Sequence, residues 1–128
     1  MIEDALRSRL LADSSISAII ADRMYVLQAP QGINTPYVVY LIASETPIYT
    51  VGCVADELII QYSVFSTTYN QAQSIAKAIR ANLENAHGII GGVDVSSIRY
   101  EGTGANKREE DSQLVHISYD FRIILNNQ

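Results

Sequence analysis

Apolar residues change their spacing several times along the chain, and each change predicts a new structural element. Near the start, helical spacing links Ile2, Ala5, Leu6 and Leu10. A polar break, Asp13 to Ser15, then interrupts the stretch LLADSSISAIIADR. This pattern predicts two short helices, with Ser14 or Ser15 as the N-cap of the second.

Two strands are predicted in the first half of the chain. The segment Tyr37 to Ser44 is apolar and β-branched, and it follows Pro30 and Pro36. Because proline fixes φ and biases the preceding residue towards extended geometry, we expect residues 28–36 to form an ordered loop before the strand. The second strand runs from Glu57 to Ser66, and its alternation gives one apolar face, formed by Leu58, Ile60, Tyr62 and Val64.

A long helix is predicted directly after the second strand. Its apolar stripe consists of Ala72, Ile75, Ala76, Ile79 and Leu83. Thr68 and Gln71 have the spacing of a capping box at the start of the helix. Gly88 suits the C′ position that ends it, and His87 then falls in the last turn, where a cation favours the helix dipole.

The second half of the chain predicts two further strands and a fold class. One strand covers Val93 to Glu101, the polar loop of residues 102–112 follows, and the last strand alternates from Val115 to Leu125. Residues 1–128 therefore read as a single α+β domain. Its antiparallel sheet has the order β-β-α-β-β, with the long helix packed on it and two short helices before it.

Composition narrows the classes of function. The 128 residues carry a net charge of −5 and no basic run, which argues against tight nucleic-acid binding. The longest apolar run, Tyr37 to Ala43, is far shorter than the ~20 residues of a membrane span, and the acidic N-terminus lacks the pattern of a signal peptide. We therefore expect a cytoplasmic protein. Tyrosine supplies eight of the ten aromatic residues, which suits protein interfaces as well as core edges.

Residues that could carry catalysis are few and scattered. His116 and Asp120 share the polar face of the last strand, but no nucleophile elbow or second histidine at ligand spacing accompanies them, so cross-strand pairing explains them. Cys53 has no neighbouring base and cannot form an internal disulfide. We predict no catalytic, cofactor-binding or metal-binding residues.

The loop GTGANKREED, residues 102–111, has two glycines after a strand but leads into another strand, whereas a phosphate-binding loop must open a helix. Two interpretations stay open for it: a solvated hairpin loop, or a loop that docks on a neighbouring subunit. Together with the proline-containing loop it gives the candidate interface: Pro30, Gln31, Gly32, Asn34, Thr103, Asn106, Lys107, Arg108, Glu109, Glu110 and Asp111.

Four stretches of the sequence together resemble the tail-completion family of long-tailed bacteriophages and prophages, also called tail terminators or tail-to-head joining proteins. They are LLAD, DRMYVLQAPQGINTPYVVY, IIQYSVFSTTYNQAQSIAKAIRANL and ISYDFRII. The family-like positions are Arg23, Tyr25, Pro30, Gln31, Pro36, Tyr37, Val38, Asp120, Phe121 and Arg122. The chain departs from the family at Ser14, where proline is common, and at Ala21, where glycine is expected.

The resemblance implies a structural role in the virion. Family members form rings, usually hexameric, that cap the tail tube and join it to the head connector or stopper protein. DNA would only pass through the lumen, no membrane or cofactor would take part, and assembly would occur in the cytoplasm of the host bacterium. Two alternatives remain: another neck component or tail-tube-like subunit, and a small ligand-binding or enzymatic α+β domain. A pocket ringed by His116, Asp120 and Cys53 would favour the enzyme.

Overall fold

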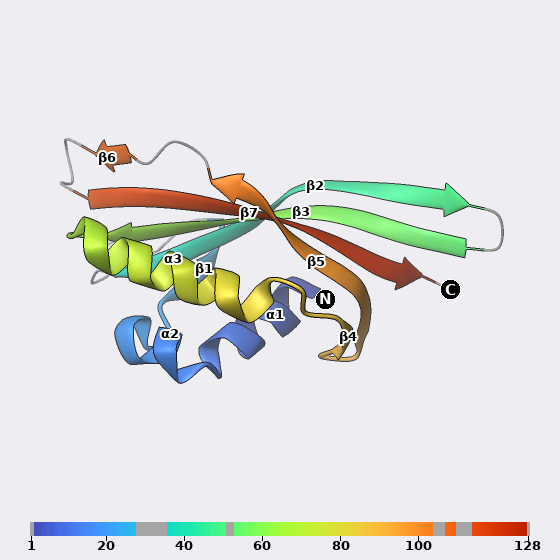
Figure 1. Cartoon of the computed structure of the whole chain (residues 1–128), viewed down its shortest axis with the longest axis horizontal. Coiled ribbons are helices and arrows are strands. Elements are labelled where there is room, and N and C mark those ends of the chain that lie inside the picture. The colour runs from blue at the N-terminus through green and yellow to red at the C-terminus, as the bar shows by residue number, and fades with distance from the viewer. Residues whose placement is uncertain (1, 28–35, 51–52, 104–106, 110–113, 128) are drawn as a thin grey trace.

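The computed structural model of the chain describes residues 2–27, 36–50, 53–103, 107–109 and 114–127. Its elements lie in two layers, with helices covering one face of a long, twisted sheet (Figure 1). In chain order they are α1 (Ile2–Leu11), α2 (Ser14–Ile20), β1 (Met24–Val26), β2 (Tyr37–Thr50), β3 (Cys53–Ser66), α3 (Tyr69–Leu83), β4 (Gly88–Ile90), β5 (Val93–Thr103), β6 (Lys107–Glu109) and β7 (Leu114–Asn127). No helix among the described residues has the length and apolar character needed to cross a membrane.

The sheet has the strand order β1-β2-β3-β7-β5-β4, with β6 pairing β7 beside this path. The predicted α+β class is confirmed, but the sheet is mixed, because β1 runs parallel to β2 while the other pairs are antiparallel. The β-β-α-β-β order missed β1, β4 and β6. Each of these strands has only three residues, too few for an alternating pattern to be recognised.

The hydrophobic core lies between the helices and the sheet. The predicted stripe of α3 is buried throughout, at Ala72, Ile75, Ala76, Ile79 and Leu83. It packs on the predicted apolar face of β3, formed by Leu58, Ile60, Tyr62 and Val64, and on the matching face of β7, formed by Ile117, Tyr119, Phe121 and Ile123. Alternation therefore predicted correctly which side of each strand faces the core.

The helix ends differ from the predicted capping in three places. Asp13, not Ser14 or Ser15, caps α2, since its carboxylate accepts hydrogen bonds from the Ser15 N–H (3.0 Å) and hydroxyl (2.6 Å). Thr68 caps α3 as predicted, but the Gln71 side chain accepts a hydrogen bond from the Ser66 hydroxyl at 2.6 Å, so the capping box is only half formed.

The third difference lies at the C-terminal end of α3. The helix ends at Leu83, and Asn85 takes the left-handed conformation with φ 67°. Asparagine tolerates this region better than most residues, so it ends the helix earlier than the glycine that follows. Gly88 instead begins β4, and His87 is exposed beyond the helix, away from its dipole.

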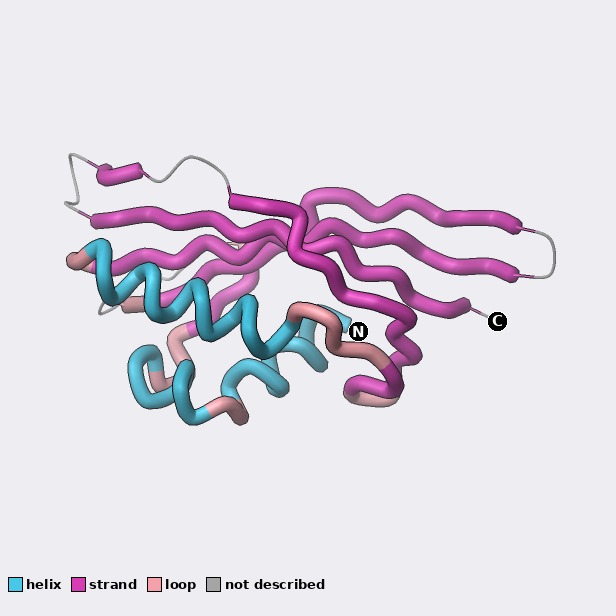
Figure 2. Tube along the Cα trace, in the orientation of Figure 1, coloured by secondary structure: helices cyan, strands magenta, loops and turns pink. Residues whose placement is uncertain are grey.

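The hairpin of β2 and β3 extends well beyond the predicted strands 37–44 and 57–66. The backbone ladder continues to the pair Thr50 and Cys53, with one register shift between Ile42 and Ser44. Together with the C-terminal end of β7 these strands project past the helices (Figure 2). We call this part of the sheet, 44–50 with 53–57 and 124–127, the distal wing. The sequence did not predict the wing, because Pro47 and several acidic residues interrupt the alternation of apolar and polar residues there.

Candidate interaction surface

The face of the sheet opposite the helices carries a mixed surface, which we call the open face. On β3 it consists of the half-buried Ile59, Gln61, Ser63 and Phe65. Their partners in register on β7 are Arg122, Asp120, Ser118 and His116. The surface combines apolar, aromatic and charged side chains. This composition is more typical of a surface that contacts other proteins than of one that faces only solvent.

Three rings form a stack across the open face. Phe65 lies between Tyr37 and His116, with ring centroids 5.0 Å and 4.5 Å away. The two contacts follow from register, since Phe65 pairs with Tyr37 on β2 and with His116 on β7. His116 Nε2 also lies 3.1 Å from the Ser118 hydroxyl. His116 is thus held by its cross-strand neighbour, as the sequence predicted, and it rigidifies one end of the open face.

A cluster of charges occupies the middle of the open face. The Nε atom of Arg122 lies 2.7 Å from a carboxylate oxygen of Glu101 and 3.3 Å from one of Glu57. Its side chain is 45% exposed, so water screens both ion pairs and each stabilises the fold only modestly. The cluster joins β3, β7 and β5.

Asp120 adds to the acidic character of the open face. Its Oδ1 atom is buried, and it has no hydrogen-bond partner among the described residues. Burial raises the pKa of this carboxyl above its ordinary value, and the nearby charge of Glu101 raises it further. Because a buried acceptor without a donor is unfavourable, the isolated chain leaves this position incompletely satisfied.

The residues that could have built an enzyme site do not meet. His116 is opposite Phe65 near one end of β3, whereas Cys53 begins β3 at the far end of the distal wing. Twelve residues of strand separate these ends, roughly 40 Å at the usual rise. The hollow at α1 and the β4–β5 turn, and two others at the sheet, contain none of His116, Asp120 and Cys53 among their described lining residues. The described residues also contain no group of three or more metal-binding side chains.

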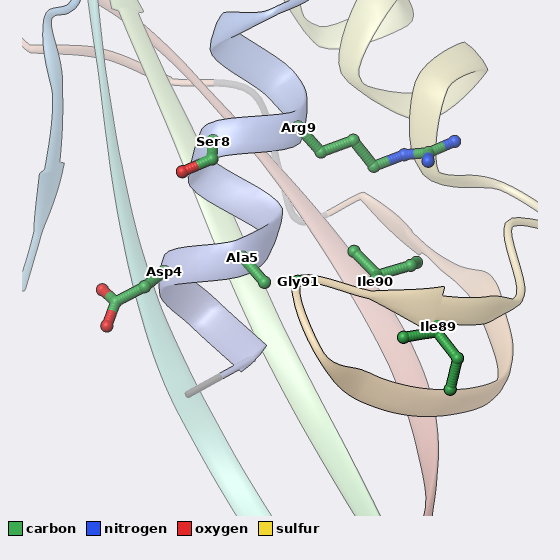
Figure 3. Close-up of a pocket in the computed structure, with 7 residues that line it drawn as sticks. All are labelled: Asp4, Ala5, Ser8, Arg9, Ile89, Ile90 and Gly91. Atoms are coloured by element: carbon green, nitrogen blue, oxygen red, sulfur yellow. The ribbon is translucent and has the colours of Figure 1, made fainter.

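One hollow lies between α1 and the turn that joins β4 to β5 (Figure 3). It encloses about 600 Å³ and is lined by Asp4, Ala5, Ser8, Arg9, Ile89, Ile90 and Gly91. The charged side chains do not converge on it: Asp4 and Arg9 extend in opposite directions from α1, and Arg9 donates to the Asn82 side chain at 2.8 Å. A site for a small ligand needs convergent polar groups, so this hollow does not have the character of an active site.

Most of the predicted interface residues fall outside the described residues. This is the case for Pro30, Gln31, Gly32, Asn34, Asn106, Glu110 and Asp111. The backbone of Lys107 to Glu109 is described, and it forms β6, which pairs with β7 from His116 to Leu114. Part of the segment 102–111 therefore extends the sheet, and the docking role of the segment stays a prediction.

Arg23 fixes the point where the proline-containing loop enters β2. Its Nε donates to the carbonyl oxygen of Pro36 at 2.9 Å, and Nη2 donates to that of Ile19 at 3.1 Å. One guanidinium thus joins the end of α2 to the start of β2. The sequence did not predict the contact between Arg23 and Pro36, because no local pattern connects residues thirteen positions apart.

Residues 4–126 match the sequence profile of the family described as tail completion protein gp17. The chain belongs to this family. It is a structural protein of a phage-type tail, as the resemblance implied. No curated protein sequence matches this chain.

Two solved structures share the fold of the tail completion protein. One is described as the virion of a native gene transfer agent particle; a chain in it superposes with a TM-score of 0.78 at 17% identity, over 95% of this chain and 92% of that one. The other, whose name states no function, gives a TM-score of 0.57 at 13% identity, over 98% of this chain and 96% of that one. At these identities the comparison establishes the shared architecture of helices on one face of a sheet.

Proposed function

We propose that this tail completion protein forms a ring that closes the tail tube and joins it to the connector or stopper protein of the head. The observation that carries the proposal is the family match over residues 4–126, nearly the whole chain. The fold supports it, because helices cover only one face of the sheet and leave the open face, two sheet edges and the distal wing for contacts with other proteins.

The ring would be built from identical subunits, six in the usual arrangement of the family. A ring requires a head-to-tail contact between two different surfaces of the same subunit. The loops of residues 28–36 and 102–111 are proposed as further contacts with a neighbouring subunit or the adjoining ring. A preformed contact loses less conformational entropy on docking than a flexible one, and Arg23 holds Pro36 at the end of the first loop.

DNA would meet this protein only as it passes through the ring. The net charge of −5 is consistent with such a passage, because a lumen that attracted phosphates would hold the DNA back. The protein would act without catalysis and without a membrane, in the virion, after assembly in the host cytoplasm. We expect His116→Ala and Cys53→Ala to leave assembly intact.

The experiment that tests the proposal uses particles made without this protein. Separately purified heads and tails should remain unjoined in its absence, and the added protein should restore joining. Electron microscopy of tails bound to the protein should show a ring at the tube end facing the head, and native mass spectrometry should give its copy number. Heads and tails that join without the protein would contradict the proposal, and a ring at another level of the neck would favour a stopper or adaptor.

A further inference from the structure

We propose that the distal wing of one copy docks on the next copy of this chain, with Tyr49 entering an apolar hollow beside β1. We call this the edge hollow; it is lined by Glu3, Val26, Leu27, Tyr40, Leu41 and Ile42. The proposal rests on the ring proposed above, for which it specifies one subunit contact. Two complementary features on different parts of the chain carry it.

The first feature is a tyrosine presented by the wing. Tyr49 is 75% exposed, the highest value among the exposed large apolar residues that the structure describes. It lies next to the end of β2 and pairs with Val54 in the last part of the ladder. A tyrosine held on a rigid sheet is a favourable interface anchor, because it offers a large apolar area and few rotatable bonds.

The second feature is a hollow that suits one aromatic ring. The edge hollow encloses about 210 Å³, and apolar side chains form nearly all of its lining. Val26 is 53% exposed and Leu27 70%, so its outer wall lacks cover in the isolated chain. Glu3 is the one charged residue among the described residues of its lining. The hollow therefore matches an aromatic ring in size and in apolar character.

The two features cannot meet within one chain. Ile42 lines the edge hollow, and seven residues of β2 separate it from Tyr49, about 23 Å at the rise of an antiparallel strand. The wing cannot fold back over this distance, because its ladder is continuous from Ser44 to Thr50 and β7 supports it on the other side. The partner must therefore be another molecule. Since the two surfaces differ, copies joined in this way form a head-to-tail series that closes into a ring when the rotation allows.

Side-chain docking fits the wing better than the addition of a strand to its free edge. β1 covers β2 only from Val38 to Tyr40, which leaves the outer edge of the wing open. Pro47 lies in the middle of this edge and has no N–H to donate, and Glu45 adds an exposed charge beside it. Both features discourage an added strand. Tyr49 is the large apolar side chain that this part of the wing exposes most.

The experiment measures joining of separate heads and tails by four variants in matched pairs. Tyr49→Ser removes the anchor, and Tyr69→Ser makes the same change at another exposed tyrosine, on α3. Leu27→Asn removes the outer wall of the hollow while keeping a residue that tolerates its φ of 69°. Ile89→Asn alters a residue that is also 70% exposed but lies on β4. We expect Tyr49→Ser and Leu27→Asn to lose about tenfold or more of the joining activity, and the two controls to retain it.

A cross-linking experiment tests the contact directly and keeps Tyr49 and Leu27 in place. The variant carries two new cysteines in a Cys53→Ser background. Leu41→Cys places a thiol at the edge hollow, and Ile48→Cys places one next to Tyr49 in β2. Protein bound to tails, treated with a short bifunctional thiol reagent, should give a ladder of covalent multimers that adding Tyr49→Ser abolishes. The control pair Ser74→Cys with Ile48→Cys should give no ladder.

The outcomes separate this inference from the proposed function. Normal joining by Tyr49→Ser and Leu27→Asn, or the absence of a ladder on tails that carry the protein, would overturn the wing contact and leave the ring proposal standing. Equal losses in the control variants would also overturn it. If the unmodified protein neither joins heads to tails nor binds tube ends, the proposed function fails, whereas a ladder from the purified protein would still support the contact between copies. Tyr49→Phe keeps the aromatic ring of the side chain and should retain more joining activity than Tyr49→Ser.

Discussion

Gly91 lies so close to Ala5 that a Cβ atom on Gly91 would be 2.5 Å from the Ala5 Cβ and 3.3 Å from its Cα. The contact brings the turn after β4 against α1, which joins the start of the chain to the far edge of the sheet. Glycine is needed here twice over, because φ at Gly91 is also positive, at 57°. The neighbouring Gly92 has a φ of 82° but open space around it.

This pair of glycines gives the first prediction. Gly92→Ala should lower the free energy of unfolding by about 1–2 kcal/mol through backbone strain alone. Gly91→Ala should cost the same strain and, in addition, about 1–3 kcal/mol from forcing apart α1 and the turn. Denaturant unfolding of both variants measures the difference. Equal losses would mean that α1 moves away without cost, and that its packing against the turn is loose.

The second prediction concerns the core under α3. Ile79 is fully buried, so Ile79→Asp places an unpaired charge in an apolar environment at a cost of several kcal/mol. This is comparable with the whole stability of a domain, about 5–15 kcal/mol, and we expect insoluble or unfolded protein. Lys77→Asp is the control, since Lys77 is exposed on the same helix and its replacement should leave circular dichroism and solubility unchanged. A soluble Ile79→Asp protein with normal melting would contradict the orientation of α3.

The periodicity of apolar residues predicted the core from the sequence. In a strand every second residue is buried, and in a helix every third or fourth, so the pattern repeats over many positions. The stripe of α3 and the apolar faces of β3 and β7 are long enough for this signal. Short contacts carried no such signal. Asp13 caps α2 and Asn85 follows the end of α3, where the sequence had suggested Ser14 or Ser15 and Gly88. A cap depends on one side chain or one φ angle, and several neighbouring residues in the sequence are equally suitable for it.

The candidate surface was harder to predict, because it depends on register between distant segments. His116 was correctly assigned to a cross-strand role, but its stacking on Phe65 required the pairing of β3 with β7. The distal wing was not predicted, because Pro47 and Glu45 interrupt the alternation of apolar and polar residues. The wing is held by backbone hydrogen bonds, which do not depend on that alternation. The loops chosen as the interface stay predictions.

The third prediction concerns the charge cluster on the open face. Arg122→Ala removes both ion pairs of Arg122, but its exposure limits the loss to about 1 kcal/mol or less at low salt. The loss should shrink as salt rises to 1 M, where screening acts within about 3 Å. Arg99→Ala is the control, because Arg99 is opposite Arg122 in the ladder and, among the described residues, no ion pair involves it. A loss for Arg122→Ala that does not depend on salt would indicate packing by its aliphatic stem instead.

The fourth prediction uses the pH dependence of Asp120. Its folded pKa is raised, first by burial and then by Glu101, so the folded chain holds this proton more tightly than the unfolded chain does. The resulting stability is present below the ordinary pKa of 3.8 and is lost as pH rises through the folded value. Asp120→Asn should therefore be more stable than the unmodified chain at pH 7, with the difference narrowing towards pH 3.5. Unfolding measured at a series of pH values checks this, and a difference that widens on acidification would show that Asp120 gains a donor in the isolated fold.

The place of β7 in the sheet has a consequence for how the protein is made in the cell. β7 follows the other described strands in the chain, yet it lies between β3 and β5 at the centre of the sheet. While a ribosome is still producing the chain, the hairpin of β2 and β3 and the hairpin of β4 and β5 can each form, but no strand pairs the two hairpins with each other. Both present an unpaired inner strand until residues 114–127 emerge, which makes the partial chain prone to aggregation. The sheet of a subunit is therefore complete only after translation has passed β7.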